Sequence, residues 1–149
     1  MGRRYVAIMD GISVSAAGDL IEIAAPSDAV VRILGAIFTQ EASETSEQLD
    51  FSISRATTSG SGGSSVTAAA LEASDAAFGG TVERNNSTPA GTLTTIHKEA
   101  VNILTGWYYQ PIPETMIHIA PSGIVVFRID TAPGAALTMD GTVWFEEIG

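Results

Sequence analysis

Cysteine is absent from the 149 residues, so neither disulfide bonds nor thiolate-bound metal sites can contribute to the fold. Basic residues are few: seven Lys and Arg stand against seventeen Asp and Glu, which gives a net charge of −10. This balance argues against sequence-independent binding to nucleic acid phosphates. No apolar run approaches the roughly 18 residues of a membrane span, and the run before Asp10 is too short for a signal peptide. We therefore expect no nucleic acid or membrane partner and no export signal.

Charged residues of both signs are also scarce, at 16% of the chain against 45% apolar residues. Soluble domains average about a quarter charged residues, so more of this surface than usual is neutral and suited to contact with other subunits. The length predicts one domain, residues 1–149, large enough to bury a substantial core.

The final segment, 137–147, reads LTMDGTVWFEE and alternates with a period of two. This pattern is typical of a strand with one face on a core and the other toward water or a partner. Gly141 on the inward face marks a bulge or a close approach of another strand. Trp144 falls on the polar face, so either a partner or a loop covers it or it is an isolated exposed ring.

Strand patterns recur along the chain and predict an all-β domain of roughly nine or ten strands, a jelly roll or β-sandwich. The expected strands are 4–9, 19–25, 29–39, 49–55, 93–104, 107–110, 116–120, 124–130 and 137–147. Asp10-Gly11 predicts a hairpin turn after the first of them. At most one short helix is expected, over 76–78, with Ser74 or Asp75 as its cap.

Two segments outside these strands are candidate partner contacts. Residues 2–5 begin with Gly2 and the basic pair Arg3 and Arg4 and end at Tyr5, and we expect them to form a short N-terminal arm. Residues 57–65 read TTSGSGGSS, the composition of a flexible segment, and we interpret them as a long loop inserted in the domain. The contact residues expected in this loop are Ser59, Gly60, Ser61 and Gly62.

The densest aromatic cluster is Trp107, Tyr108 and Tyr109. Side chains alternate along a strand, so the three rings cannot all face the core. We expect two rings to pack inside and one to lie at an interface, because exposed aromatics are enriched at protein contacts and on sugar-binding platforms. All three residues, with Trp144, complete the candidate partner surface.

Catalytic motifs are missing: no cysteine nucleophile and no GxSxG turn occurs, and GSGGS lacks the GK[ST] ending of a phosphate loop. His97 and His118 could hold a metal with Glu99 or Glu114, or else one is exposed and one packed.

The acidic segment with Glu41, Glu44, Glu47 and Asp50 could hold calcium or simply be solvated, and it lacks the dense spacing of a calcium loop. We expect no enzyme activity, no cofactor and no metal.

Four stretches give the chain a resemblance to a known family. They are the opening RRYVAIMDGISVSAAGDLIEI, the APSD turn before the long apolar strand, the TTSGSGGSS loop and the close LTMDGTVWFEEIG. Together they resemble the head decoration, or cement, proteins of tailed phages and prophages. Several such proteins are jelly-roll trimers on the outer capsid surface.

The resemblance implies a homotrimer that binds the major capsid protein, stabilises its contacts, has no enzymatic activity and is located in the virion after synthesis in the bacterial cytoplasm. The alternative is a lectin-like or receptor-binding module of a phage head fibre or tail, with outward aromatics stacked on sugars.

Overall fold

The computed structural model describes residues 2–42 and 45–149. They form strands and one short 3-10 helix, and among them no helix is long and apolar enough to cross a membrane. The elements are β1 (Arg3–Val14), β2 (Gly18–Ala24), β3 (Val30–Gln40), β4 (Gln48–Ala56), β5 (Ser64–Ser65), β6 (Ala69–Ala70), β7 (Thr81–Arg84), β8 (Thr94–Asn102), β9 (Trp107–Tyr109), η1 (Pro113–Thr115), β10 (His118–Ile119), β11 (Ile124–Ile129) and β12 (Leu137–Ile148).

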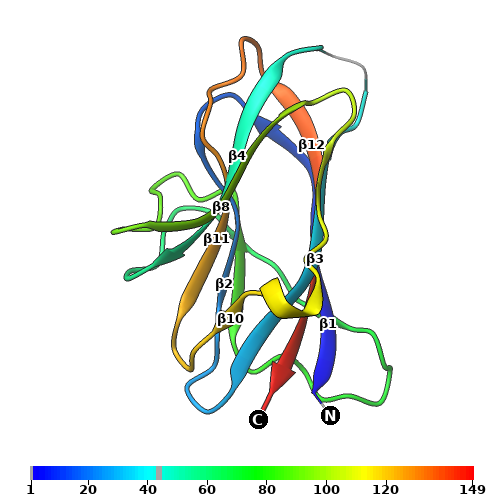
Figure 1. The fold of residues 1–149 in the computed structure, drawn as a ribbon, viewed down its shortest axis with the longest axis vertical. Coiled ribbons are helices and arrows are strands. Elements are labelled where there is room, and N and C mark those ends of the chain that lie inside the picture. Colours follow the sequence, from blue (N-terminus) through cyan, green and yellow to red (C-terminus); the bar gives the residue numbers. More distant parts are fainter. Residues whose placement is uncertain (1, 43–44) are drawn as a thin grey trace.

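Two antiparallel sheets pack face to face (Figure 1). Sheet A has the order β10-β3-β12-β1-β6, with β9 also paired to β3, and sheet B has the order β5-β7-β2-β11-β4-β8. When β5, β6, β7 and β10 are set aside, β9-β3-β12-β1 faces β2-β11-β4-β8. Successive strands of this set alternate between the two sheets except β4 and β8, which are neighbours in sheet B. This is the strand order of a jelly roll, a double-sheet solution that folds two Greek keys onto one core. The prediction of an all-β sandwich is confirmed.

Each of the nine predicted segments contains a strand. The sequence missed β5, β6 and β7, which bring the total to twelve. β5 and β6 are two residues each of Ser and Ala, which have little strand preference. β5 pairs with β7 and β6 pairs with β1, so both depend on long-range contacts that no local pattern predicts.

β12 is the centre of sheet A, between β3 and β1. Its odd-numbered residues from Leu137 to Phe145 are buried, as the alternation predicts. Gly141 is the point of close approach: a Cβ there would lie 2.5 Å from Cδ1 of Phe38. The strand at the C-terminal end therefore closes the core, and Arg3 of β1 pairs with Glu147 beside it.

The hairpin expected at Asp10-Gly11 is wrong, because β1 continues through both residues. The register with β12 shifts between Met9 and Ile12, so Asp10 and Gly11 form a β-bulge. Gly11 has a φ of 59°, a left-handed conformation that glycine adopts without strain. Its N–H donates to Asp140 Oδ1 at 2.8 Å. The dipeptide Asp-Gly is therefore compatible with a β-bulge as well as with a hairpin turn.

The expected N-terminal arm is also wrong, since Arg3, Arg4 and Tyr5 are the first residues of β1. They pair in register with residues of β12, and Arg3 forms an ion pair with Glu147. The apolar alternation that begins at Tyr5 places that ring in the core, and the strand pairing extends to the residues before it.

Residues 76–78 form no helical turn. The Tyr5 hydroxyl donates to the Ala76 carbonyl at 2.8 Å, and the Phe78 ring packs against Tyr5 and Phe145 with centroids 5.4 and 4.9 Å away. These contacts bind the segment to the core in an irregular conformation, which overrides the local preference for a helical turn.

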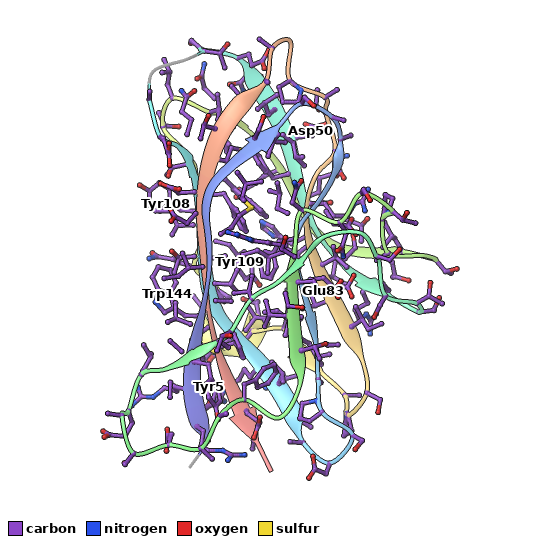
Figure 2. All side chains as sticks on the ribbon, turned by 180° about the vertical axis from the view of Figure 1, so that it is seen from behind. Tyr5, Asp50, Glu83, Tyr108, Tyr109 and Trp144 are labelled. Carbon is purple, nitrogen blue, oxygen red and sulfur yellow. The ribbon has the colours of Figure 1, made fainter. Side chains whose placement is uncertain are left out.

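Aromatic rings fill the space between the sheets. Trp107 of β9 stacks on Phe38 at 5.4 Å and on Phe51 at 5.0 Å, and so joins sheet A to sheet B. Figure 2 shows Tyr109 and Tyr5 between the sheets, whereas Tyr108 and Trp144 point away from sheet A. Two rings of the Trp107–Tyr109 cluster are therefore inside and one is outside, as predicted.

Candidate docking surface

The outer face of sheet A presents an apolar band. Directly paired residues of antiparallel strands share a face, so the register gives the rows of this surface. One row crosses from β9 to β1 and consists of Tyr108, Ile37, Thr142 and Ile8. The next row consists of Gly35, Trp144 and Val6. We use the name apolar band for Val6, Ile8, Ile37, Tyr108 and Trp144.

The two ends of the band are the most exposed. Tyr108 is 57% exposed and Ile8 is 51% exposed, although both belong to a paired strand. Trp144 in the centre keeps 36% of its surface exposed. Its indole lies over Gly35, where a Cβ would come 3.8 Å from Trp144 Cε3. The missing side chain at Gly35 accommodates part of the ring, and the chain leaves the rest uncovered.

Opposite charges flank the band along the strand direction. At one end, carboxylate oxygens of Asp10, Glu41 and Asp140 lie within 4.8 Å of one another. At the other end, Arg32 forms an ion pair with Glu146, and exposed Arg4 lies beside Glu146 in the next strand. The face is therefore apolar in the middle and charged at both ends, the arrangement of an interface core with a polar rim.

Sheet B differs because loops of its own chain cover the part of its outer face around β2. Glu22 of β2 is buried and accepts hydrogen bonds from the Gly60 N–H at 2.8 Å and from Asn86 Nδ2 at 3.3 Å. Asp19 accepts from the Ala90 N–H at 2.7 Å. These carboxylates hold the segments around residues 60 and 86–90 over the sheet.

The Gly/Ser loop is thus fixed by contacts within the chain. Gly60 is buried against Asn86, Ser61 exchanges backbone hydrogen bonds with Thr88, and Ser64–Ser65 form β5. Ser59 and Gly62 are exposed, on the side of the molecule away from the apolar band. The loop and the band belong to different faces, so the predicted contact residues do not form one surface.

Three aromatic residues predicted as partner contacts are buried instead: Tyr5, Trp107 and Tyr109. Trp107 and Tyr5 are both fully buried, because each is at an inward position of its strand and completes an aromatic cluster. Burial also raises the pKa of the Tyr5 hydroxyl, with the Glu147 carboxylate as a second cause. Tyr109 is buried as well, and burial raises its pKa.

Gly2 packs against Glu146, where a Cβ would lie 2.5 Å from Cγ of that residue. Arg3 is half-buried in its ion pair with Glu147. Of residues 2–5, Arg4 has the side chain most open to a partner.

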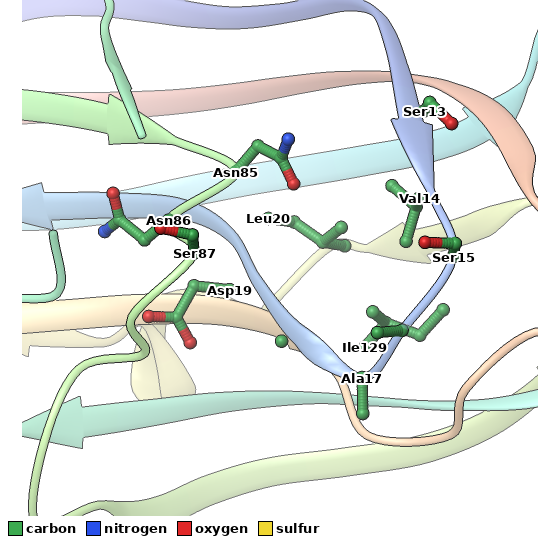
Figure 3. Close-up of a pocket in the computed structure, with 12 residues that line it drawn as sticks. Ser13, Val14, Ser15, Ala17, Asp19, Leu20, Asn85, Asn86, Ser87 and Ile129 are labelled. Carbon is green, nitrogen blue, oxygen red and sulfur yellow. The ribbon is translucent and has the colours of Figure 1, made fainter. Parts of the chain in front are cut away.

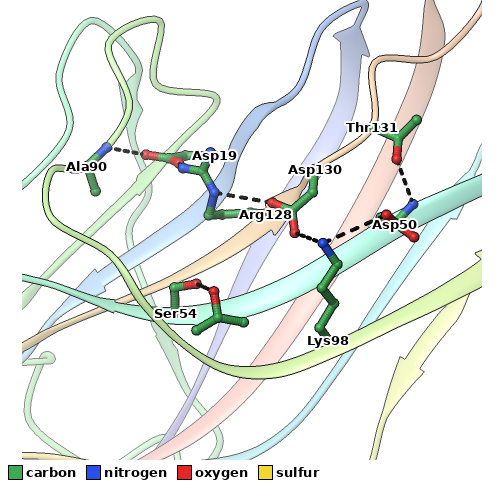
Figure 4. Close-up of polar contacts among 9 residues, drawn as sticks. Asp19, Asp50, Ser54, Ala90, Lys98, Arg128, Asp130 and Thr131 are labelled. Atoms are coloured by element: carbon green, nitrogen blue, oxygen red, sulfur yellow. Dashed lines mark hydrogen bonds and ion pairs between the residues drawn. The ribbon is translucent and has the colours of Figure 1, made fainter.

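A charged network runs across the outer face of sheet B (Figure 4). Arg128 pairs with buried Asp19 and lies 3.5 Å from Asp130, and Lys98 bridges Asp130 at 3.5 Å and Asp50 at 3.7 Å. Burial raises the pKa of Asp19 more than the Ala90 N–H and the Arg128 guanidinium lower it. No local pattern predicts this network, since its members come from β2, β4, β8, β11 and the residue after β11.

The hollow in Figure 3 is a cavity of about 230 Å³ between the end of β1 and the segment around Asn86. Small side chains such as Ser13, Ala17 and Ser87 line most of it. Asp19 at the edge of this cavity binds Arg128 and accepts a hydrogen bond from the Ala90 N–H, so both of its carboxylate oxygens are engaged in contacts within the chain.

The histidines do not converge. His97 packs its ring on Tyr109 at 4.9 Å and lines one hollow with Glu99, while His118 is exposed and lines another with Glu114. In the acidic segment, Glu47 accepts from the Gly134 N–H at 3.0 Å and Asp50 faces Lys98. Glu44 lies outside the described residues.

Sequence reasoning missed Val6, Ile8 and Ile37. A signal was present: residues 5–9 read YVAIM, which is apolar at outward as well as inward positions. Apolar residues on both faces are typical of a strand that is covered on both sides.

No protein-family model, no curated protein sequence and no solved structure matches the chain.

Proposed function

We propose that this chain is a structural protein of a bacteriophage virion: a decoration, or cement, protein that docks on the outer capsid surface through the apolar band. It assembles there as a homotrimer and stabilises contacts between major capsid proteins. Its role is binding and not catalysis. The class of partner comes from the family resemblance, and the docking face comes from the geometry of sheet A.

The observation that carries the proposal is the contrast between the two outer faces. Loops that buried Glu22 and Asp19 hold in place cover sheet B around β2, and charged side chains occupy its β4–β8 side. Sheet A instead exposes Tyr108, Ile8 and Trp144 in adjacent rows. Adjacent exposed apolar side chains favour a protein contact over a solvated surface. Tyr and Trp are also the residue types that contribute most at interface centres.

Burial of the band would stabilise an assembled shell by mass action. Each Å² of apolar surface removed from water contributes about 25 cal/mol, so even a partial increase in burial of these side chains favours the bound state. Only an assembled lattice presents the complete binding site, so binding shifts the equilibrium toward the shell. A trimer multiplies the effect through avidity. The net charge of −10 keeps the chain from competing for the packaged genome.

Ile8→Glu tests the docking face. The side chain is exposed, so the variant folds, but a carboxylate in the band opposes burial against another protein. Co-sedimentation with shells assembled from the major capsid protein should carry down the wild type and leave Ile8→Glu in the supernatant, while light scattering should show the same trimer for both. Leu104→Glu is the matched control, because Leu104 is 50% exposed in the turn between β8 and β9, outside the band.

A shell assay tests the cement role. Shells assembled from the major capsid protein encoded in the same genome are heated with wild type, Ile8→Glu or no added chain. The wild type should raise the melting temperature, and Ile8→Glu should not. Equal melting in all three samples would rule out the proposal.

A further inference from the structure

A cleft of about 580 Å³ opens where the free edges of the two sheets approach each other. β8 is the last strand of sheet B, and β9 lies beyond β3 in sheet A. The segment from 110 to 117, which contains η1, forms the remaining wall. The volume is within the usual range of small-molecule sites. Its walls are β8, β9 and the proline-containing segment, and each of the two strands is paired within its own sheet.

Polar groups line the inner part of the cleft in fixed positions. The Trp107 indole N–H donates to Glu99 Oε1 at 2.5 Å, which orients the carboxylate. The Glu99 side chain is 39% exposed, so its second oxygen can accept from a ligand. His97, two residues earlier on the same face of β8, packs on Tyr109 with its Nε2 3.6 Å from Glu99 Oε1. None of these three residues, Trp107, Glu99 and His97, belongs to the apolar band.

The mouth of the cleft is apolar and includes a flat ring. Tyr108 is exposed at its edge, together with Ile96 and Ile112, which is 61% exposed. Gln110 contributes an amide next to Tyr108. A ligand that fits must therefore offer hydroxyl or amide groups to Glu99 and His97 and an apolar face to Tyr108.

This combination excludes two ligand classes. An anion would approach Glu99 in a chain of net charge −10, which is unfavourable. A purely apolar ligand would bury the Glu99 carboxylate without compensation, which costs binding free energy. A pyranose has hydroxyl donors around its edge for a carboxylate and an imidazole, and C–H groups on its face that pack on an aromatic ring.

We propose that the cleft between β8 and β9 is a carbohydrate-binding site, with Glu99 and His97 as hydrogen-bonding residues and Tyr108 as the stacking residue. It shares Tyr108 with one end of the apolar band, and it does not depend on the proposed capsid role.

The experiment is a glycan array probed with the labelled full-length chain, followed by calorimetry with each free oligosaccharide that gives a signal. Neutral glycans should bind the wild type. Glu99→Gln should weaken binding at least about tenfold, because a charge-assisted hydrogen bond is lost, while the Gln carbonyl still accepts from Trp107. His97→Gln and Tyr108→Ala should also weaken binding.

Leu104→Ala serves as the control and should bind like the wild type. A silent array would overturn the proposal, as would equal affinity for wild type and Glu99→Gln. Binding of lysine- or arginine-rich peptides in place of glycans would overturn it too, since Glu99 would then select cations. Ile8→Glu separates this site from the docking face: it should lose binding to the shell and keep binding to the free oligosaccharide.

Discussion

Trp107 and Tyr108 are adjacent in the chain and occupy opposite environments. The Trp107 ring is fully buried between Phe38 and Phe51, while the Tyr108 ring is 57% exposed. Strand geometry alone separates them, because consecutive side chains point to opposite faces. The same aromatic chemistry therefore stabilises the core at one position and supplies a binding surface at the next.

This separation predicts unequal effects on stability. Trp107→Ala removes a ring that connects both sheets and should lower the free energy of unfolding by about 3–5 kcal/mol. Tyr108→Ala removes an exposed ring and should cost no more than about 1 kcal/mol. Urea denaturation followed by circular dichroism measures both values. Similar losses for the two variants would contradict the assignment of inner and outer faces.

Asp19 predicts a pH dependence. Burial raises its pKa above the ordinary value of 3.8, so the folded state binds this proton more tightly than the unfolded state does. The resulting stabilisation is complete below 3.8 and is lost as the pH rises through the folded pKa.

Comparison with Asp19→Asn, which does not titrate, isolates this effect from the other carboxylates. Relative to Asp19→Asn, the wild type should lose stability across that acidic range and show a constant difference at higher pH. Urea denaturation at a series of pH values measures the difference. A relative gain in stability over the same range would mean that Arg128 and the Ala90 N–H outweigh burial.

At the scale of the element, β12 shows how a strand combines close packing inside with a binding face outside. Gly141 faces inward, where the Phe38 ring takes the space of a side chain, and Trp144 faces outward over Gly35. The two glycines lie on adjacent strands and face opposite sides of the same sheet. Each accommodates an aromatic ring, one from the core and one from the surface.

Gly141→Ala should destabilise the fold by about 1–3 kcal/mol, because a Cβ would lie 2.5 Å from the Phe38 ring and force it to move. Thr142→Ala, one residue along and half-buried on the outer face, is the control and should cost less than about 1 kcal/mol. Thermal unfolding of both variants tests the packing. If Gly141→Ala were neutral, the close approach of Phe38 would not limit this strand.

At the scale of the whole molecule, the first and last strands are partners. Arg3 of β1 pairs with Glu147 of β12, so both termini lie at the same end of the sandwich (Figure 1). The central position of β12 means that sheet A is incomplete until nearly the whole chain is present. Jelly-roll order places almost every strand beside one that is distant in sequence.

Folding should therefore be slow, on a scale of milliseconds to seconds, since non-local pairings must overcome loop-closure entropy before they gain contacts. Stopped-flow fluorescence can follow it through Trp107 in a Trp144→Phe variant, because Trp107 is then the single tryptophan and becomes fully buried. Complete refolding in microseconds would contradict this expectation.

The sequence by itself determined nine of the twelve described strands and the direction of their side chains, because period-two alternation is a local property that burial of one face imposes. It identified 137–147 as a closing strand, and it separated Tyr108 from its two neighbours. It failed at Asp10-Gly11, where the same residues suit a turn and a bulge, and at residues 2–5, where pairing extends a strand beyond its apolar pattern.

Only the tertiary structure decided which outer face is covered. Glu22 and Gly60 are separated by 38 positions and Asp19 and Ala90 by 71, so the bonds that hold loops over sheet B leave no periodic trace in the sequence. The apolar band has the same origin, since Tyr108, Ile37 and Ile8 become neighbours only when β9, β3, β12 and β1 pair. Local alternation sets where each side chain points, and long-range pairing sets what it meets there.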